Sequence, residues 1–279
     1  MNTQRLLPIA HLAVSEAARS VEQSAVMSFE SITSQALVAA RARISMAARE
    51  SRRRKLSAAG TYYGTTATAQ LEETLDEFAS ESIDATVTRN HYGCLVLNAA
   101  RTLFIDVDFV PANSECRKTG SADRRHATWE TMLDDLCLVL AGERDLGFRV
   151  YRTRAGFRLL ATNREFEPHS PRAKELMKAV SADEDFMQLC RLQRNFRAHL
   201  TPKPWRCGAK RPPNFFPRES ADDQRAFSEW LSGYEDACRD RATCRLLGHV
   251  GRPDTHRRIA PIIELHDRET KALESLALA

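Results

Sequence analysis

Two aspartates, Asp106 and Asp108, lie two positions apart in the hydrophobic segment Leu103–Val110. The apolar content of this segment predicts a buried β-strand. Because strand side chains alternate between faces, both carboxylates project from one face, with Cα atoms about 7 Å apart. Two carboxylates on a mostly buried face repel each other and are costly to desolvate unless a cation lies between them.

A divalent metal ion is one cation that would stabilise this pair. Mg²⁺ and Mn²⁺ prefer carboxylate oxygens, so Asp106 and Asp108 are predicted metal ligands. The alternative is an edge strand in which the aspartates are solvated or paired with arginines. The chain contains 41 lysine and arginine residues, so both interpretations stay open.

Arginines gather on a second pair of predicted strands, within residues 148–162. Strand alternation places Arg152 and Arg154 on the face opposite Tyr151, and Arg158 follows the turn on the partner strand. If this hairpin neighbours the strand that carries the two aspartates, arginines and carboxylates converge on one surface. That surface either grips a metal–triphosphate, with the three arginines as phosphate contacts, or is a closed salt-bridge network without a ligand.

The segment Gln193–Arg206 mixes basic residues with aromatic ones and contains two stiffening prolines. Basic side chains beside aromatic rings suit a phosphate backbone with stacked bases. We therefore expect Lys203, Trp205 and Arg206 to contact nucleic acid. The alternative is a rigid loop that packs Trp205 into the core and caps a helix with Lys203.

A further acidic candidate is Asp267, which follows Glu264 in the segment Ile262–Asp267. Either residue would supply a third carboxylate to the pair of aspartates, and Asp267 is the predicted third metal ligand. The competing interpretation places Asp267 at a helix N-terminus, where its side chain satisfies free N–H groups. No Walker A loop, dinucleotide-binding glycine motif or nucleophile elbow accompanies these residues.

Composition sets broad limits on the class of protein. The chain has 279 residues, 43% of them hydrophobic and 28% charged, which is ordinary for a globular protein. Its net charge of +4 rests on arginine, whose planar fork matches phosphate, so a nucleotide or a nucleic acid is the expected partner. Because no stretch is apolar enough for a membrane span and residues 1–18 make a poor signal peptide, we expect a cytoplasmic protein without membrane contact. Seven scattered cysteines predict reduced thiols.

The periodicity of apolar residues predicts an α+β fold with an antiparallel, RRM-like sheet packed against helices. We expect an N-terminal helical extension over residues 1–60 and an α+β domain over residues 61–279. The expected helices within the domain are 69–79, 129–140, 171–181, 182–195, 222–237 and 267–279. The expected strands are 85–88, 94–97, 103–110, 148–153, 157–162 and 242–250, with 259–265 as a strand or the start of a helix. A tight antiparallel connection over residues 98–101 is expected to join two of these strands.

The order of these elements resembles the archaeo-eukaryotic primase-like superfamily. Phe104–Asp108 matches the family's hydrophobic strand that ends in Asp-x-Asp, and Tyr151–Arg158 resembles its second motif. Arg158 stands where the family has a nucleotide-binding histidine, and Glu264 or Asp267 would be the third acidic residue. The resemblance implies two-metal nucleotidyl transfer, in which carboxylate-held ions activate a 3′-hydroxyl and stabilise the leaving pyrophosphate. If Arg158 cannot replace the histidine, the chain is a palm-like domain that has lost or changed its activity.

The sequence therefore leaves two functions open. The first is a metal-dependent nucleotidyl- or phosphoryl-transfer enzyme with Asp106, Asp108 and Arg158 as catalytic residues. The second is a non-catalytic module that binds nucleic acid or protein and contains an internal network of aspartate–arginine ion pairs.

Overall fold

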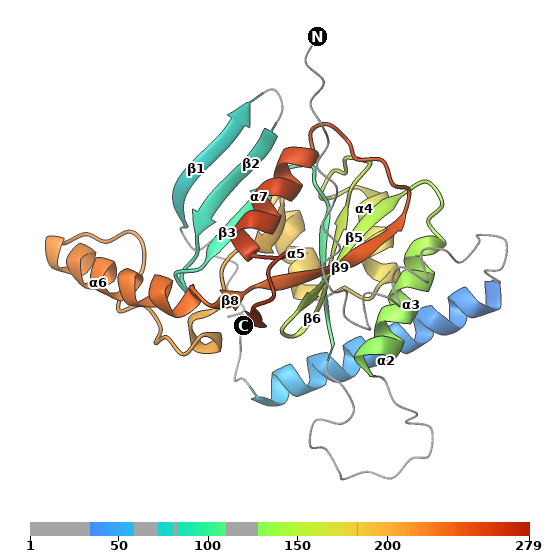
Figure 1. Cartoon of the computed structure of the whole chain (residues 1–279), viewed down its shortest axis with the longest axis horizontal. Coiled ribbons are helices and arrows are strands. Elements are labelled where there is room, and N and C mark those ends of the chain that lie inside the picture. The colour runs from blue at the N-terminus through green and yellow to red at the C-terminus, as the bar shows by residue number, and fades with distance from the viewer. Residues whose placement is uncertain (1–33, 59–71, 81–82, 110–127, 183) are drawn as a thin grey trace.

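Two antiparallel four-stranded sheets and the helices that cover them make up the computed structural model of this chain, which describes residues 34–58, 72–80, 83–109, 128–182 and 184–279 (Figure 1). The helices are α2 Ser34–Ala58, α3 Trp129–Ala141, α4 Pro171–Ala179, α5 Glu184–Gln193, the short 3₁₀ helix η2 Pro204–Arg206, α6 Ala221–Cys238 and α7 Ala260–Thr270. The strands are β1 Glu73–Ser80, β2 Ile83–Arg89, β3 Leu95–Ala99, β4 Phe104–Asp108, β5 Gly147–Thr153, β6 Gly156–Ala161, β7 Phe196–His199, β8 Arg241–Ala242, β9 Cys244–Gly251 and β10 Ala277–Leu278. The predicted α+β class is confirmed.

The first sheet has the strand order β1-β2-β3-β7 and the second has the order β4-β6-β5-β9. In the second sheet β6 pairs antiparallel with both β4 and β5, so β4 and β5 run parallel and α3 connects them. This arrangement is a split β-α-β unit. β8 and β10 form a separate parallel pair. Both β4 and β7 are therefore edge strands, one in each large sheet.

The two faces of the second sheet are covered by different helices. Residues 105, 107, 157 and 159 face α3, and its N-terminal Trp129 packs edge-on against Phe157. A capping box at Thr128 and Thr131 begins α3, which buries an apolar stripe that includes Leu133, Leu136 and Leu140. On the other face, His266 of α7 packs against Phe104 and Tyr151. The α7 face carries the polar residues of the site.

Part of the N-terminal helical extension belongs to the same hydrophobic core. Ala40 and Ile44 of α2 are fully buried in that core, and α2 packs against α3. Arg43 donates to the Asp135 carboxylate across this contact, with 2.7 Å between Nε and Oδ2. The predicted boundary near residue 60, the signal-peptide assessment of residues 1–18 and the predicted loop 111–126 all lie outside the described residues.

Three predictions of local structure are wrong. Residues 73–80 form a strand and not a helix, because a full antiparallel ladder with β2 satisfies their backbone groups. The segment 98–101 does not join neighbouring strands: β3 pairs with β2 and β7, whereas β4 pairs with β6. The segment 267–279 is not a helix, because α7 ends at Thr270 and Lys271 adopts a left-handed conformation (φ 55°) that terminates it.

Several other predictions agree with the structure. The hairpin of β5 and β6, the helices α3, α4, α5 and α6, and a strand over residues 244–251 all lie close to their predicted positions. None of the helices in the described ranges is both long and apolar enough to cross a membrane.

Candidate functional site

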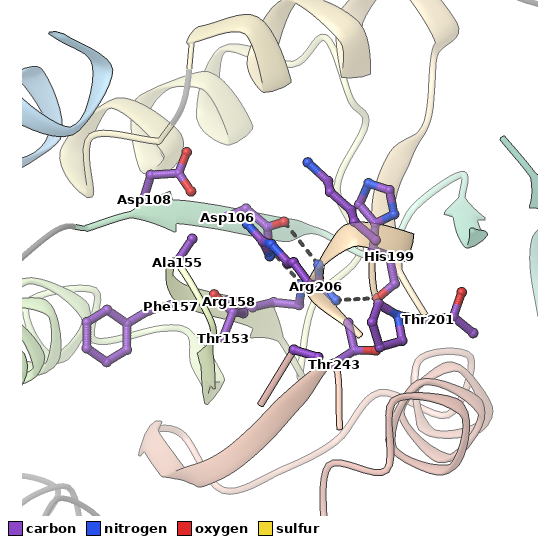
Figure 2. A pocket seen from close by; sticks show the side chains of 13 residues that line it. Asp106, Asp108, Thr153, Ala155, Phe157, Arg158, His199, Thr201, Arg206 and Thr243 are labelled. Carbon is purple, nitrogen blue, oxygen red and sulfur yellow. Dashed lines mark hydrogen bonds and ion pairs between the residues drawn. The ribbon is translucent and has the colours of Figure 1, made fainter. Parts of the chain in front are cut away.

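A hollow lies where the edge strand β7 of the first sheet approaches the edge strand β4 of the second (Figure 2). It measures about 540 Å³ including its open mouth. Its lining comes from β4, the β5–β6 hairpin, the end of β7 with the loop that follows it, and the residues around 243 and 279. The residues are Asp106, Asp108, Thr153, Ala155, Phe157, Arg158, His199, Thr201, Pro202, Lys203, Arg206, Thr243 and Ala279.

Asp106 and Arg158 are direct neighbours across the β4–β6 ladder. The Arg158 guanidinium donates from Nε to Asp106 Oδ1 at 2.7 Å and from Nη2 to Oδ2 at 3.0 Å. This is a bidentate ion pair, in which the Arg158 side chain is 3% exposed and the Asp106 side chain is 31% exposed. Burial disfavours the charge on Arg158, but the adjacent carboxylate outweighs burial and raises the pKa of the guanidinium.

Arg158 also connects the two sheets. Its Nη1 donates to the His199 carbonyl of β7 at 2.9 Å, and Figure 2 shows the guanidinium between Asp106 and His199. The same Nη1 lies 3.4 Å from His266 Nε2 of α7. Every nitrogen of this buried guanidinium therefore has a protein partner, which is the condition under which a buried arginine is stable.

The polar contacts continue from Arg158 to the far end of the α7 face. His266 Nδ1 lies 3.1 Å from Asp267 Oδ1, and this carboxylate accepts bonds from Tyr151 Oη at 2.7 Å and from the Arg149 guanidinium. We call Asp106, Arg158, His266, Asp267, Tyr151 and Arg149 the buried polar network. Burial lowers the pKa of His266 and, together with the Asp267 charge, raises that of Tyr151, so both are neutral links between charged residues.

Asp267 is therefore not a partner of Asp106 and Asp108 around an ion. It lies in the last turn of α7, it does not begin a helix, and it does not line the hollow. Among the described residues no three His, Cys, Asp or Glu side chains form a group that could hold a metal ion. Because Asp106 already accepts two bonds from Arg158, the residues present do not fit the two-metal centre that the primase-like resemblance implies.

Of the three predicted phosphate contacts on the hairpin, Arg158 lines the hollow, whereas Arg152 and Arg154 do not. Arg152 lies on the α3 face, as the strand alternation predicts, with its guanidinium carbon 2.9 Å from the centre of the Trp129 ring. Burial there lowers the pKa of Arg152 to about 10, and the side chain donates to the Gly156 carbonyl at 2.9 Å. Arg154 is exposed in the turn and donates to the Leu278 carbonyl at 3.5 Å.

The loop after β7 holds the remaining predicted contacts. Lys203 and Arg206 line the hollow, whereas Trp205 between them is 40% exposed. The Tyr234 hydroxyl of α6 donates to the Pro202 carbonyl at 2.5 Å and lies 2.8 Å from Thr201 Oγ1, so the loop is fixed from behind. The loop is rigid, but Trp205 does not pack into the core and Lys203 makes no side-chain cap for η2.

His199 is the principal residue of the hollow that the sequence reasoning missed. It lies on β7, with Phe196 and Ala198 buried and Arg197 and His199 on the other face. That two-residue alternation was a readable strand signal inside the segment Gln193–Arg206, which was interpreted as a nucleic-acid contact or a rigid loop. Burial, together with the charges of Lys203 and Arg158, holds the pKa of His199 well below its usual value, so the ring is neutral at pH 7.

The side-chain charges of the hollow sum to a positive value. Asp106 and Arg158 neutralise each other and His199 is neutral, which leaves Asp108 against Lys203 and Arg206.

Comparisons with protein-family models, curated proteins and solved structures give no match to this chain. What the site can do must therefore follow from its own geometry.

Proposed function

We propose that this chain is a non-catalytic nucleic-acid-binding module whose hollow receives a backbone phosphate. The observation that carries the proposal is the construction of one rigid turn: Lys203 and Arg206 face the hollow, while Trp205 between them remains exposed. Two cations supply the electrostatic attraction to phosphate, and an exposed indole supplies a surface on which a base can stack.

The internal ion pair supports binding over catalysis. Asp106 stabilises a buried guanidinium that holds the two sheets together, and it is therefore committed to the fold. A catalytic carboxylate would have to exchange this partner for an ion and leave Arg158 buried with its charge unpaired, which is strongly unfavourable. The backbone of the loop needs no rearrangement to present its cations, which favours affinity because little ordering is required on binding.

The experiment is a salt titration of binding by fluorescence anisotropy with labelled single-stranded oligonucleotides. We expect the logarithm of the association constant to fall linearly with the logarithm of the salt concentration. The variants Lys203→Gln and Arg206→Gln should each weaken binding and reduce the slope by about 0.7, the value for one lost single-strand phosphate contact. Equal affinity and slope in both variants and the wild-type protein would refute the proposal.

A matched control is available beyond the end of β6. Arg164 follows the end of β6 opposite to the hollow, is 56% exposed at its side chain and pairs with Asp145. Arg164→Gln removes the same type of charge from a position outside the hollow, so it should leave affinity nearly unchanged. A loss equal to that of Arg206→Gln would mean that binding responds only to total charge.

Metal-dependent nucleotidyl transfer is the second candidate, because Asp106 and Asp108 both line the hollow beside basic residues, and it requires Asp106 to exchange Arg158 for an ion. It predicts that Mn²⁺ raises the melting temperature of the wild-type protein and does not raise that of Asp106→Ala. The binding proposal predicts no difference between the two metal responses. Extension and cleavage assays with labelled oligonucleotides then separate the candidates by chemistry.

A further inference from the structure

Four aromatic rings contact one another in sequence, beginning at Trp205, which lies between the lining residues Lys203 and Arg206, and continuing at the β2–β3 turn of the first sheet. The rings are Trp205, Tyr92, His91 and Phe215, and we call them the aromatic shelf. Neighbouring ring centres are separated by 5.1 Å, 3.6 Å and 6.4 Å in that order. Three separate segments supply the rings: the β2–β3 turn, η2 and the loop before α6. The loop residue Phe215 is 61% exposed and Trp205 is 40% exposed.

Positive charge gathers at the Trp205 end of the shelf. The Arg211 guanidinium carbon lies 5.5 Å from the centre of the Trp205 ring, and Lys203 Nζ lies 5.8 Å from it. Burial lowers the pKa of His91, so this ring is neutral at pH 7 and acts as an aromatic surface. Cations close to an exposed ring match a ligand that alternates negative groups with flat apolar ones, which is the chemistry of a nucleic-acid strand.

The turn that carries Tyr92 and His91 is built rigidly. The Asn90 carboxamide oxygen accepts from the Tyr92 and Cys94 backbone nitrogens at 3.0 Å and 3.1 Å. Gly93 adopts a left-handed conformation (φ 79°), and a Cβ atom there would lie 2.2 Å from the Trp230 ring of α6. The indole of Trp230 in turn donates to the Lys210 carbonyl at 2.9 Å, which ties α6 to the loop that continues to Phe215.

We infer that the aromatic shelf stacks the unpaired bases of a single strand whose phosphate occupies the hollow. This inference rests on the proposed function and names its ligand class: a single strand bound with little dependence on base sequence. A duplex does not fit, because its bases are already stacked on one another and their flat faces cannot reach the rings. A mononucleotide would use only one end of the row and would gain only part of the contact.

The experiment compares three probes of equal length, about 16 nucleotides, which is the upper end of common single-strand site sizes. They are an oligothymidine, the same chain without bases (an abasic oligonucleotide) and a duplex that contains the oligothymidine. We expect the wild-type protein to bind the oligothymidine more tightly than the other two. Trp205→Ala and Phe215→Ala should each weaken oligothymidine binding by roughly 5- to 150-fold, the range for loss of one stacked base.

The abasic probe distinguishes base stacking on the aromatic shelf from phosphate binding in the hollow. Trp205→Ala and Phe215→Ala should leave its affinity unchanged, whereas Lys203→Gln should weaken both the abasic probe and the oligothymidine. If the wild-type protein binds both probes equally, the shelf does not stack bases and the phosphate site still stands. If neither probe binds, the proposed function fails together with the inference.

Controls address stability and the choice of partner. Met46→Ala removes an exposed apolar side chain (63% exposed) from α2, outside the shelf, and should leave every affinity unchanged. Thermal melts of all variants identify any loss of binding that comes from unfolding. Binding of a polyglutamate peptide with the same dependence on Trp205 and Phe215, in the absence of oligothymidine binding, would overturn the inference in favour of an acidic protein partner.

Discussion

Replacement of Asp106 by alanine distinguishes an ion-pair role from a metal-ligand role by the sign of its effect on stability. The Arg158 side chain is 3% exposed, so Asp106→Ala leaves a buried guanidinium with the His199 carbonyl as its strongest remaining acceptor. Removal of one partner from a buried ion pair costs about 3–5 kcal/mol. Because the Asp106 side chain is 31% exposed and water can reach the vacated position, we expect about 2–4 kcal/mol here.

The opposite sign follows if the two aspartates form a metal site. In the metal-free protein their carboxylates would repel each other, and removal of one would then stabilise the fold or leave it unchanged. The assay is equilibrium unfolding in urea at pH 7 with chelator present. A change smaller than about 0.5 kcal/mol, the scale of an ordinary surface substitution, would refute the ion-pair argument.

Combined substitution of Asp106 and Arg158 tests whether the cost of Asp106→Ala comes from the charge left unpaired on Arg158. Asp106→Leu combined with Arg158→Met removes both charges, so the double variant should be more stable than Asp106→Ala alone. Asp145→Ala is the matched control, because its carboxylate is 58% exposed and pairs with Arg164 on the surface. It should cost less than about 1 kcal/mol.

Three further predictions concern the residues around the site. Tyr151→Phe removes the hydroxyl that donates to Asp267 at 2.7 Å, and urea unfolding should show a loss of about 1.5–3 kcal/mol, whereas an unchanged midpoint would contradict that bond. The pKa of fully buried His266 is lowered by burial, so below the unfolded value of about 6.5 the unfolded chain binds a proton that the folded chain does not. As the pH falls below that value, His266 should lower the free energy of unfolding by up to about 1.4 kcal/mol per pH unit. A plot of unfolding free energy from pH 7 to 5.5 should therefore be flatter in His266→Gln than in the wild-type protein, and parallel plots would contradict the assignment. Gly156→Ala places a Cβ atom 1.9 Å from the Val107 carbonyl oxygen, so calorimetry should record a large drop in melting temperature, and a wild-type value would show that the two strands can separate locally at no cost.

The convergence of Asp106 and Arg158 was predictable from the sequence, but whether they form an ion pair or part of a metal site was not. Alternation along β5 correctly places Arg152 on the face opposite Tyr151. The expected convergence of Arg152 with the carboxylates is not seen, because that face packs against Trp129 of α3, whereas Arg158 pairs with Asp106. Whether a neighbouring arginine closes an ion pair or leaves room for an ion depends on strand order and register. Those are decided by contacts between segments far apart in the chain, on which local periodicity carries no information.

The wrong predictions of local structure also arise because strand pairing depends on segments far apart in the chain. The β1 sequence has helical spacing of its apolar residues, and only its ladder with β2 makes it a strand. A tight hairpin was expected between β3 and β4 because they are consecutive, yet β7 pairs with β3 from almost a hundred residues further along the chain. This long-range pairing brings His199 to the hollow, so neither the complete first sheet nor the complete lining of the site was accessible from local patterns.

The buried polar network explains how a shallow hollow between two sheets keeps a defined shape. Arg158 bonds to β4 through Asp106, to β7 through the His199 carbonyl and approaches His266 on α7. The loop that carries Lys203 and Arg206 begins directly after β7, so the position of its cations is set by the same guanidinium. An apolar replacement of the pair would hold the sheets together without directional bonds, and would let the loop shift relative to β4.

We therefore expect Asp106→Leu combined with Arg158→Met to remain folded and yet bind oligothymidine more weakly than the wild-type protein. Unchanged affinity in that variant would mean that the ion pair serves the fold alone and that the loop is positioned by Tyr234.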